Sequence, residues 1–230
     1  MDPAGINRNA SFLDVIMDRH SSRAFRSEPV PKDALQKVIE AAIRAPSWSN
    51  TQPWEFTVVG GRHMERLKEA FVEKVRAGVP PNPDIPFPEF SEKYVDRRVR
   101  NGRRLFAELG IAREDKAKRA EHNLNMYQFF GAPDGIIVHI DRELGPYSIL
   151  DVGLAIENLL LAAHCLGLGT CPMAMAAAYP DVLREILSIP ASKKIICGIA
   201  IGYADEDSPA ARFRSEREPF ETFVTWRRDG

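Results

Sequence analysis

The chain has 230 residues, of which 44% are hydrophobic and 27% are charged, and its formal net charge at pH 7 is −1. These values predict a single soluble domain spanning residues 1–230 with a sizeable buried core, and they lack the basic excess that is typical of nucleic-acid-binding surfaces. No charged segment followed by an apolar run opens the sequence, and its three cysteines lack CxxC spacing, so we expect a cytoplasmic protein without a signal peptide or a disulfide framework.

A run of cationic and hydroxyl side chains follows the first predicted helix. Ser11 and Asp14 have the spacing of a helix-capping box, and the short helix after them leads into Arg-His-Ser-Ser-Arg-Ala-Phe at Arg19–Phe25. Guanidinium forks pair with phosphate oxygens and hydroxyl groups fill the remaining acceptor positions, so this composition suits a phosphate group. A solvated helix end would have the same composition, and the run alone leaves both interpretations open.

A second polar run precedes the first predicted strand. Pro31 begins an amphipathic helix that we expect to end at Pro46, and Trp54–Val59 alternates in the manner of a strand. Between them, Pro46–Pro53 offers hydroxyl groups and two side-chain amides. That composition suits a polar heterocycle or a ribityl chain, although an ordinary turn would also contain it.

The middle of the chain departs from ordinary core composition. Arg62–Ala77 has helical periodicity, but Gly78–Pro88 contains five prolines, which exclude a regular helix or a central strand. Helical periodicity then returns at Glu89–Leu109 and at about 113–129. The arginines of the first of these helices are interpreted as a solvated face, and attraction of an anionic ligand such as a pyridine-nucleotide phosphate is the alternative. We expect residues 78–113 to form a substrate-facing insertion outside the core.

The second half of the chain is predicted to supply most of the core. Gly135–Ile140 is almost continuously apolar, as in a strand buried on both faces. A helix capped by Ser148 and running to about Leu166 is apolar around nearly its whole circumference, which places it in a core or at a subunit interface. Its charged and polar residues argue against a membrane span, so we expect no membrane partner. The remaining predicted elements are a helix at Pro180–Leu187, a third strand at Ile195–Tyr203 and a C-terminal tail at about residues 205–230.

Sequence motifs for several other chemistries are missing. Gly167–Gly169 lacks the third glycine of a dinucleotide fingerprint and follows a helix rather than a strand, so it is interpreted as a helix stop. There is no Walker loop, no GxSxG elbow and no HExxH sequence. His164, Cys165 and Cys171 fit no metal-ligand spacing, and core packing without a metal is the expectation. Any redox cofactor must therefore be held without a dinucleotide-binding unit, and catalysis need not use a protein nucleophile.

The order and spacing of the two polar runs resemble the FMN-dependent nitroreductase family. Arg-His-Ser-x-Arg-x-Phe at 19–25 and Pro-Ser-x-x-Asn-x-Gln-Pro-Trp at 46–54 carry the resemblance, which covers nearly the whole chain, and the long 78–113 region is similar to the nitrobenzoate-reductase-like branch. The resemblance implies an α+β nitroreductase-like fold, with a mostly antiparallel central sheet flanked by helices, in an intertwined homodimer. It also implies an FMN cofactor, NADH or NADPH as co-substrate, and ping-pong hydride transfer through flavin N5 to nitroaromatics, quinones or similar electron-poor small molecules.

The resemblance also assigns contacts to individual positions. Arg19 and Ser21 would hold the FMN phosphate, Arg23 would lie near the pyrimidine edge of the flavin, and 47–50 would reach the cofactor from the partner subunit. Cys171–Met175 would pack against the isoalloxazine with a backbone N–H near flavin N5, and no protein side chain is expected to be catalytic. Without the resemblance, an ordinary apolar strand is an equally good interpretation of that run. The complete set of predicted cofactor-binding residues is Arg19, His20, Ser21, Arg23, Pro46, Ser47, Trp48, Ser49, Asn50, Gln52, Asn125, Gln128, Pro172, Met173, Ala174, Met175, Arg214 and Arg217.

One position departs from the better-known members of that family. They place a lysine near flavin N1 and O2, where this chain has Tyr127 and Gln128, with Asn125 matching a family amide. Gln128 can donate a hydrogen bond but supplies no charge, so the electronic tuning of the flavin would rest more on Arg23. Two alternatives stay open: the same fold performing ene reduction, reductive dehalogenation or flavin degradation, and a non-catalytic flavin-binding module.

Overall fold

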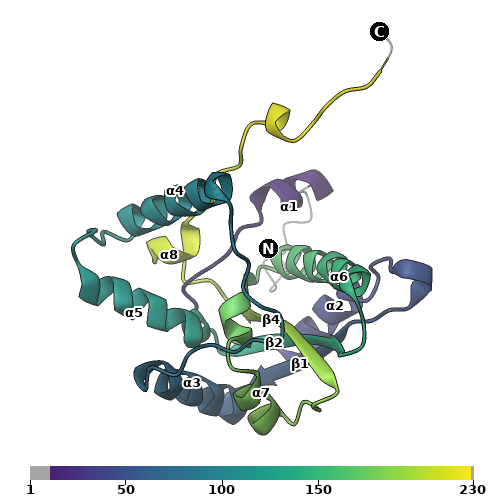
Figure 1. Ribbon diagram of the computed structural model, residues 1–230, viewed down its shortest axis with the longest axis horizontal. Helices are drawn as coiled ribbons and strands as arrows, with labels where there is room; N and C mark the ends of the chain where they lie inside the picture. Colours follow the sequence, from purple (N-terminus) through teal and green to yellow (C-terminus); the bar gives the residue numbers. More distant parts are fainter. Residues whose placement is uncertain (1–10, 229–230) are drawn as a thin grey trace.

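Four antiparallel strands form the central sheet, in the order β1-β2-β4-β3. A computed structural model describes residues 11–228 of the chain, and its strands are β1 (Glu55–Gly60), β2 (Asp134–Asp141), β3 (Gly169–Met173) and β4 (Lys193–Gly202). Helices surround the sheet on both sides (Figure 1). This arrangement confirms the predicted α+β class and the antiparallel sheet.

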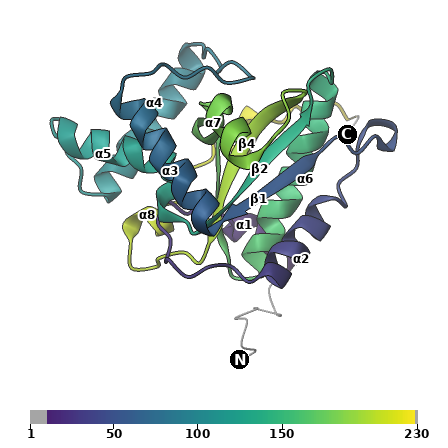
Figure 2. The same cartoon turned by 90° about the horizontal axis from the view of Figure 1, so that it is seen from below.

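Two groups of helices cover the two faces of the sheet (Figure 2). α2 (Lys32–Ala42) and α6 (Pro146–Cys165) pack against one face, and α3 (Gly61–Arg76), α5 (Lys116–Tyr127) and α7 (Pro180–Leu187) contribute to the core on the other. The sheet is therefore the middle layer of three, and each of its faces has its own hydrophobic core.

The central strand β2 shows why both faces need a cover. All its residues but the last are buried, and alternate side chains enter different cores: Ile136 and Val138 pack with α2 and α6, whereas Ile137 packs with α3 and α7. Each fully buried isoleucine stabilises the fold by about 1.5–3 kcal/mol. Glycine permits the closest approach in β4, because a Cβ on Gly198 would lie only 2.5 Å from the Cβ of Ala176.

Three further helices stand around these layers within residues 11–228. They are α1 (Phe12–Asp18), α4 (Glu92–Glu108) and α8 (Pro209–Arg212). The capping box predicted for α1 is confirmed, since the Asp14 N–H donates to Ser11 Oγ at 3.2 Å and the Ser11 N–H donates to Asp14 Oδ2 at 2.9 Å. Short 3-10 helices complete the described chain at η1 (Trp48–Asn50), η2 (Phe129–Gly131), η3 (Ala174–Ala177) and η4 (Phe220–Thr222).

Several predicted helix and strand ends are wrong. α2 ends at Ala42 instead of Pro46, because a proline disfavours helical geometry in the residues just before it. α6 begins at Pro146, so Ser148 lies inside the first turn and does not cap the helix. Proline suits the first turn of a helix because the backbone N–H groups there have no acceptor within the helix, and proline has no N–H to leave unpaired. β3 confirms the apolar strand that is the alternative interpretation of the Cys171–Met175 run, although it begins at Gly169 and ends at Met173. Pro172 lacks a ladder donor, which an edge strand tolerates. The other predicted elements are present, with ends displaced by three residues or fewer.

The α6 helix has two apolar faces with different surroundings. Val152, Ala155 and Leu159 are fully buried against the sheet, whereas Leu150 and Leu154 on the other side are 60% and 42% exposed. By length and composition α6 would be able to cross a membrane, a test that the core helix of a soluble protein also passes. Its packing against the sheet is that of a core helix, and its second face remains free for another apolar surface.

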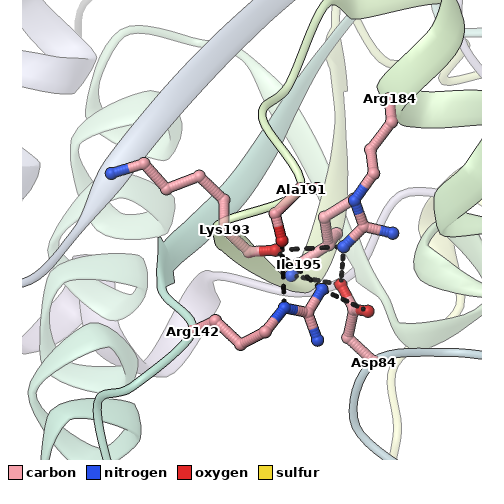
Figure 3. Close-up of polar contacts among 6 residues, drawn as sticks. All are labelled: Asp84, Arg142, Arg184, Ala191, Lys193 and Ile195. Carbon is pink, nitrogen blue, oxygen red and sulfur yellow. Dashed lines mark hydrogen bonds and ion pairs between the residues drawn. The ribbon is translucent and has the colours of Figure 1, made fainter.

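The proline-rich segment 78–91 is irregular, as predicted, yet it is anchored to the body of the protein. Asp84 accepts hydrogen bonds from Arg142 Nη2 at 3.0 Å, from Arg184 Nη2 at 2.5 Å and from the backbone N–H of Ile195 at 2.9 Å. Figure 3 shows both guanidinium groups turned toward its carboxylate, whose side chain is only 9% exposed. Burial opposes ionisation, but these hydrogen bonds outweigh it and lower the pKa of Asp84.

Candidate cofactor site

The Arg19–Phe25 segment lies along the end of the sheet rather than in solvent. Ser21 forms a parallel bridge with Thr170 of β3, and the N–H of the next residue, Ser22, donates to the Thr170 carbonyl at 2.9 Å. Ser22 is buried, and a Cβ on Gly169 would lie 2.7 Å from its Oγ. The chain becomes extended immediately after α1 because it pairs with this edge. The interpretation of the run as a solvated helix end is therefore wrong.

Arg19 is largely buried beside the edge of β3. Its side chain is 14% exposed, and its Nε lies 3.8 Å from Glu157 Oε1 of α6. Its Nη1 is buried and has no hydrogen-bond partner within the described residues. A buried guanidinium N–H without a partner is costly and is uncommon in native proteins. The guanidinium can therefore donate a further hydrogen bond to an anionic group, as the phosphate of a nucleotide cofactor would require.

His20 and Arg23 are fixed by backbone contacts to the α8 region. Both ring nitrogens of His20 lie 3.0 Å from carbonyl oxygens, those of Asp18 and Ala211. The Arg23 guanidinium donates to the Ser21 carbonyl at 3.2 Å and lies 5.9 Å from the centroid of the Phe213 ring. These contacts position both side chains. Within residues 11–228, Arg23 has no acidic partner in an ion pair.

Cys171 connects the Arg19–Arg23 cluster to the strand β3. Burial raises the pKa of the Cys171 thiol, and the charges of Arg23 and Arg19 together with a hydrogen bond to Ser21 act in the opposite direction. Arg19, Ser21 and Arg23, which were predicted to contact the phosphate or the flavin, therefore all lie near this side chain. Beyond it, Pro172 and Ala174 are exposed at the point where β3 passes into η3. The first N–H groups of a helix have no intrahelical acceptor, so a backbone donor is available where the resemblance places flavin N5.

The end of α5 approaches the same region from the opposite side. α5 packs against η3, and Asn125 and Gln128 lie in its last turn and at its C-cap. Met173 is buried below them, whereas Met175 is partly buried. His122, one turn earlier, has its pKa lowered by burial and then by the charge of Arg23. The structure thus brings together the Arg19–Arg23 segment, the β3–η3 junction and the end of α5.

The second polar run does not join this cluster within one chain. The Trp48 N–H donates to Asp151 Oδ2 at 3.1 Å, and the Trp48 ring packs against Tyr147 at 4.7 Å between centroids. Both partners lie in the first turns of α6, so Asp151 and Tyr147 are about 9 Å and about 15 Å of helix rise before Glu157, where Arg19 makes its contact. Figures 1 and 2 show the 43–54 loop projecting beside α2 and α6, away from α5 and α8.

Backbone strain is concentrated in that projecting loop. Ser49, Asn50 and Gln52 have φ values of 49°, 57° and 47°, in the left-handed region that non-glycine residues rarely adopt. The Ser47 hydroxyl accepts the Gln52 N–H at 3.0 Å and holds the turn closed. Each such residue costs about 1 kcal/mol or more, and strain of this kind clusters at functional sites. The loop is therefore held in a conformation that its own sequence does not favour.

The two predicted C-terminal arginines occupy different places. Arg214 donates to Asp18 through Nη1 to the carbonyl at 2.5 Å and through Nη2 to Oδ1 at 2.9 Å, so it borders the Arg19 cluster. Arg217 is exposed and donates to the carbonyl oxygens of Ser215 and Glu216. Arg217 borders a recess with Arg97, Arg100 and Arg104 of α4. That Arg217 and Arg19 bind the same cofactor stays a prediction.

Sequence reasoning missed a contact between α4 and the C-terminal tail. Arg97 and Arg100 both pair with Glu218, and Arg104 Nε lies 3.2 Å from Glu216 Oε1. These three arginines share one face of the helix. Arg100 and Arg104 remain 54% and 39% exposed, so the predicted solvated face is present, and ion pairs to the tail are added to it. The spacing of the arginines, together with two glutamates in the tail, was the available signal. Within the described residues, no group of three or more His, Cys, Asp or Glu side chains is arranged to hold a metal ion.

Comparison with known proteins gives consistent matches over most of the chain. A sequence model described as the nitroreductase family matches residues 16–203. A 4-nitrobenzoate reductase of Nocardioides sp. (strain LMS-CY) is 34% identical over 94% of this chain and 90% of that protein. A nitrobenzene nitroreductase of Ectopseudomonas oleovorans is 36% identical over 92% of this chain and 96% of that protein. The crystal structure of the FMN-dependent nitroreductase NfnB from Mycobacterium smegmatis in complex with NADPH is 33% identical, with a TM-score of 0.88 over 93% of this chain and 96% of that chain.

Proposed function

The chain belongs to the nitroreductase family, and we propose that it is an FMN-dependent NAD(P)H oxidoreductase that reduces nitroaromatics, quinones or similar electron-poor acceptors. The observation that carries this proposal is the buried Arg19 guanidinium, whose Nη1 has no hydrogen-bond partner within residues 11–228. It lies at the edge of β3 in a cluster with Ser21 and Arg23. The names of the relatives, which include nitrobenzoate and nitrobenzene reductases, support a nitroaromatic acceptor.

The cluster has the composition needed to hold FMN. Arg19 and the Ser21 hydroxyl would bind the phosphate, and Glu157, which is half exposed at 53%, is free to turn toward solvent when the phosphate takes its place beside Arg19. A phosphate monoester carries a charge of about −1.5 to −2 at pH 7, which the guanidiniums of Arg19 and Arg23 would balance. The Pro172–Met175 stretch would form a wall for the ring system, with Gln128 across from it.

Bound FMN would supply the hydride chemistry, accepting a hydride from NAD(P)H and passing it to the acceptor. Cys171 and His122, the two buried titratable side chains beside Arg23, would not act as a thiolate nucleophile or an imidazolium acid at neutral pH. Burial raises the pKa of Cys171, and burial together with Arg23 lowers the pKa of His122, so both groups are neutral at pH 7. Burial also raises the pKa of Cys197 to about 12. The chain would therefore bind and orient FMN, the nucleotide and the acceptor, and the protons for the reduction would come from water.

A homodimer with two sites at its interface would complete the site. The strained Ser47–Gln52 loop lies too far from Arg19 in one chain, so it would contribute from the partner subunit. α1 packs against α6, and the pair carries the large apolar surface that such a partner would cover. Its exposed members are Phe12 at 68%, Leu13 at 69%, Met17 at 82%, Tyr147 at 63%, Leu150 at 60% and Leu154 at 42%.

The C-terminal tail supports an intertwined arrangement of the two subunits. Phe220, Phe223 and Trp226 are 57%, 64% and 66% exposed, although aromatic side chains of this size are usually covered. Figure 1 shows the tail leaving the body of the protein beyond α4. A second copy would provide a surface for these three rings.

The experiment that tests this function uses the purified protein. Its absorption spectrum and the flavin released on denaturation establish whether FMN is bound. An anaerobic titration with NADH and with NADPH then measures bleaching of the flavin, and re-oxidation is followed with 4-nitrobenzoate, nitrobenzene and a quinone. A protein that holds FMN but is reduced by neither nucleotide would be a flavin-binding module, and one that neither contains nor rebinds FMN would contradict the proposal outright.

A further inference from the structure

A hollow of about 760 Å³ lies between the second half of α4, the turn after it and the first half of α5. Its volume is in the range of small-molecule binding sites. Val99, Phe106 and Ile111 give it apolar walls, and Arg103 and Arg113 border it together with Arg119. It belongs to the 78–113 region and its continuation into α5, and the candidate cofactor cluster does not include any of these residues.

The three arginines of the hollow are not neutralised by acidic neighbours. Within residues 11–228, none of the ion pairs closer than 4.0 Å includes Arg103, Arg113 or Arg119, and none of the three donates a side-chain hydrogen bond. The neighbouring face of α4 differs, because Arg97 and Arg104 pair there with glutamates of the tail. Three like charges bordering one apolar hollow repel one another, so an anion bound among them would be strongly favoured.

The floor of the hollow is suited to a planar ring. The Arg119 guanidinium lies 4.0 Å from the centroid of the Phe106 ring, so a flat cation rests on a flat aromatic surface. Guanidinium groups stack on aromatic rings as well as pairing bidentately with phosphate. A ligand that combines an aromatic base with a phosphate monoester would use both properties, and the two negative charges of that phosphate match several guanidiniums better than the single charge of a carboxylate does.

The hollow is also close to the candidate cofactor cluster. Phe106 packs edge-on against His122 with 5.3 Å between ring centroids. His122 is in turn near enough to Arg23 for that charge to act on it. An extended dinucleotide with its reactive ring beside Arg23 would therefore place its other end in the direction of Phe106.

We propose that the hollow bordered by Arg103, Arg113 and Arg119 binds the 2′-phosphorylated adenosine end of NADPH, and that it makes NADPH the preferred reductant over NADH. This inference rests on the proposed function, since it concerns the co-substrate of the same reaction. Arg103 and Arg113 would pair with the 2′-phosphate, and Arg119 would stack on the adenine. NADH lacks that phosphate and would leave the first two guanidiniums without a partner.

The test compares the holoprotein with the double variant Arg103→Gln, Arg113→Gln. A matched control is Arg62→Gln, Arg76→Gln, which removes the same charge from two exposed arginines of α3 that do not line the hollow. Calorimetry measures binding of adenosine 2′,5′-bisphosphate and of adenosine 5′-monophosphate, and anaerobic stopped-flow measures flavin reduction by NADPH and NADH.

In the double variant, we expect bisphosphate affinity and kcat/KM for NADPH to fall by at least ten- to a hundredfold, because two guanidiniums are removed and one lost charge-assisted hydrogen bond to phosphate already has about that effect. Monophosphate binding, NADH kinetics and the control variant should change little.

The outcomes separate this inference from the proposed function. If neither nucleotide reduces the wild-type holoprotein, the proposed function is contradicted. In that case, a loss of bisphosphate binding in the double variant alone would still support the hollow as a phosphate site. A protein that both nucleotides reduce equally well, or whose NADPH preference survives the double substitution, overturns the inference alone. An equal loss in the control variant would assign the effect to overall charge and overturn it too. A raised KM for 4-nitrobenzoate with unchanged bisphosphate binding would assign the hollow to the acceptor instead.

Discussion

The carboxylate of Asp84 accepts the backbone N–H of Ile195 at 2.9 Å, which ties the proline-rich segment to the beginning of β4. The two residues are separated by 111 positions in the sequence. Two guanidiniums complete the contact, from Arg142 after β2 and from Arg184 of α7. A segment that five prolines keep out of regular structure is thereby fixed to the sheet at an internal point. Two further contacts hold its first half, because the Tyr179 hydroxyl donates to the Val79 carbonyl at 2.9 Å and the Asn82 N–H donates to the Ala178 carbonyl at 2.9 Å.

Asp84→Ala should destabilise the protein by about 2–3 kcal/mol, because Arg184 loses a charge-assisted hydrogen bond and the Ile195 N–H loses its acceptor. We expect less than the full cost of breaking a buried pair, since Arg142 is 47% exposed and can be solvated. Urea unfolding measures the change. Glu89→Ala, at an exposed position of the same segment, is the matched control and should change the free energy of unfolding by less than about 0.5 kcal/mol. Equal stability of Asp84→Ala and wild type would show that Asp84 does not anchor the segment.

The stabilisation by Asp84 should depend on pH in a defined direction. Its folded-state pKa is lowered below the unfolded value of about 3.9, so the carboxylate stabilises the folded state fully above that value. The contribution is lost as the pH falls through the lower, folded-state pKa. The difference in free energy of unfolding between wild type and Asp84→Asn should therefore be constant from about pH 5 to pH 7 and shrink below about pH 4. A difference that grew on acidification would mean that the folded-state pKa is raised instead.

Periodicity and turn chemistry were enough to place most of the fold. β2 follows from a continuous apolar run, α7 from a proline at its start, and the stop of α6 from Gly167, whose φ of 73° a side chain would disfavour. For β3 the apolar run Cys171–Met175 indicates a strand only as one of two interpretations, because its residues neither alternate nor avoid proline. Its strand geometry comes from pairing with β4, and no local signal reports such pairing.

Only the parts of the candidate site that have a recognisable local motif could be predicted from the sequence. The composition of the Arg19–Arg23 run indicates an anion site, whereas the family resemblance points to Cys171–Met175, and the structure places the two segments together. The position of Arg217 depends on how the tail crosses α4, which is set by pairs such as Arg104 with Glu216 across more than 100 residues. The buried, unpaired Nη1 of Arg19 likewise depends on α6 and β3 closing around it. Such long-range contacts leave no periodic trace in a sequence.

Arg19→Ala should weaken FMN binding by about one to two decades, the cost of losing a hydrogen bond to a charged group of roughly 1.5–3 kcal/mol. Titration of the apoprotein by flavin fluorescence measures the affinity. Riboflavin, which lacks the phosphate, provides the control within the same variant, and its affinity should be unchanged. Adding Arg217→Ala should remove the remaining FMN and give a colourless protein if the tail of either subunit reaches the phosphate. An equal loss of FMN and riboflavin in Arg19→Ala would place Arg19 away from the phosphate.

Leu150→Glu with Leu154→Glu should convert the proposed dimer into a monomer with little bound FMN. Both side chains are exposed in the single chain, so a monomer tolerates the charges, whereas an apolar interface would have to bury them. Analytical ultracentrifugation measures the mass, and the flavin-to-protein absorbance ratio measures occupancy. Val79→Glu, at a 37% exposed apolar position outside α1 and α6, should remain dimeric and yellow. A wild-type holoprotein that sediments as a monomer would contradict the shared site.

Phe87→Ala with Phe90→Ala should change acceptor kinetics more than nucleotide kinetics. Phe87 and Phe90 are 38% and 46% exposed on the anchored segment, and Phe90 lies 6.5 Å from the Tyr94 ring at the start of α4. A segment fixed by Asp84 and carrying exposed rings has the properties of a wall on which a flat acceptor can stack, and each stacked pair contributes about 0.5–1.5 kcal/mol beyond its buried area. We therefore expect KM for nitroaromatic acceptors to rise by about two- to tenfold, with flavin content and NADPH kinetics retained.

Unchanged acceptor kinetics would reduce the segment to a spacer between α3 and α4. Loss of flavin would show that the segment belongs to the fold itself, because removing two exposed rings can empty the cofactor site only by disturbing the packing around it.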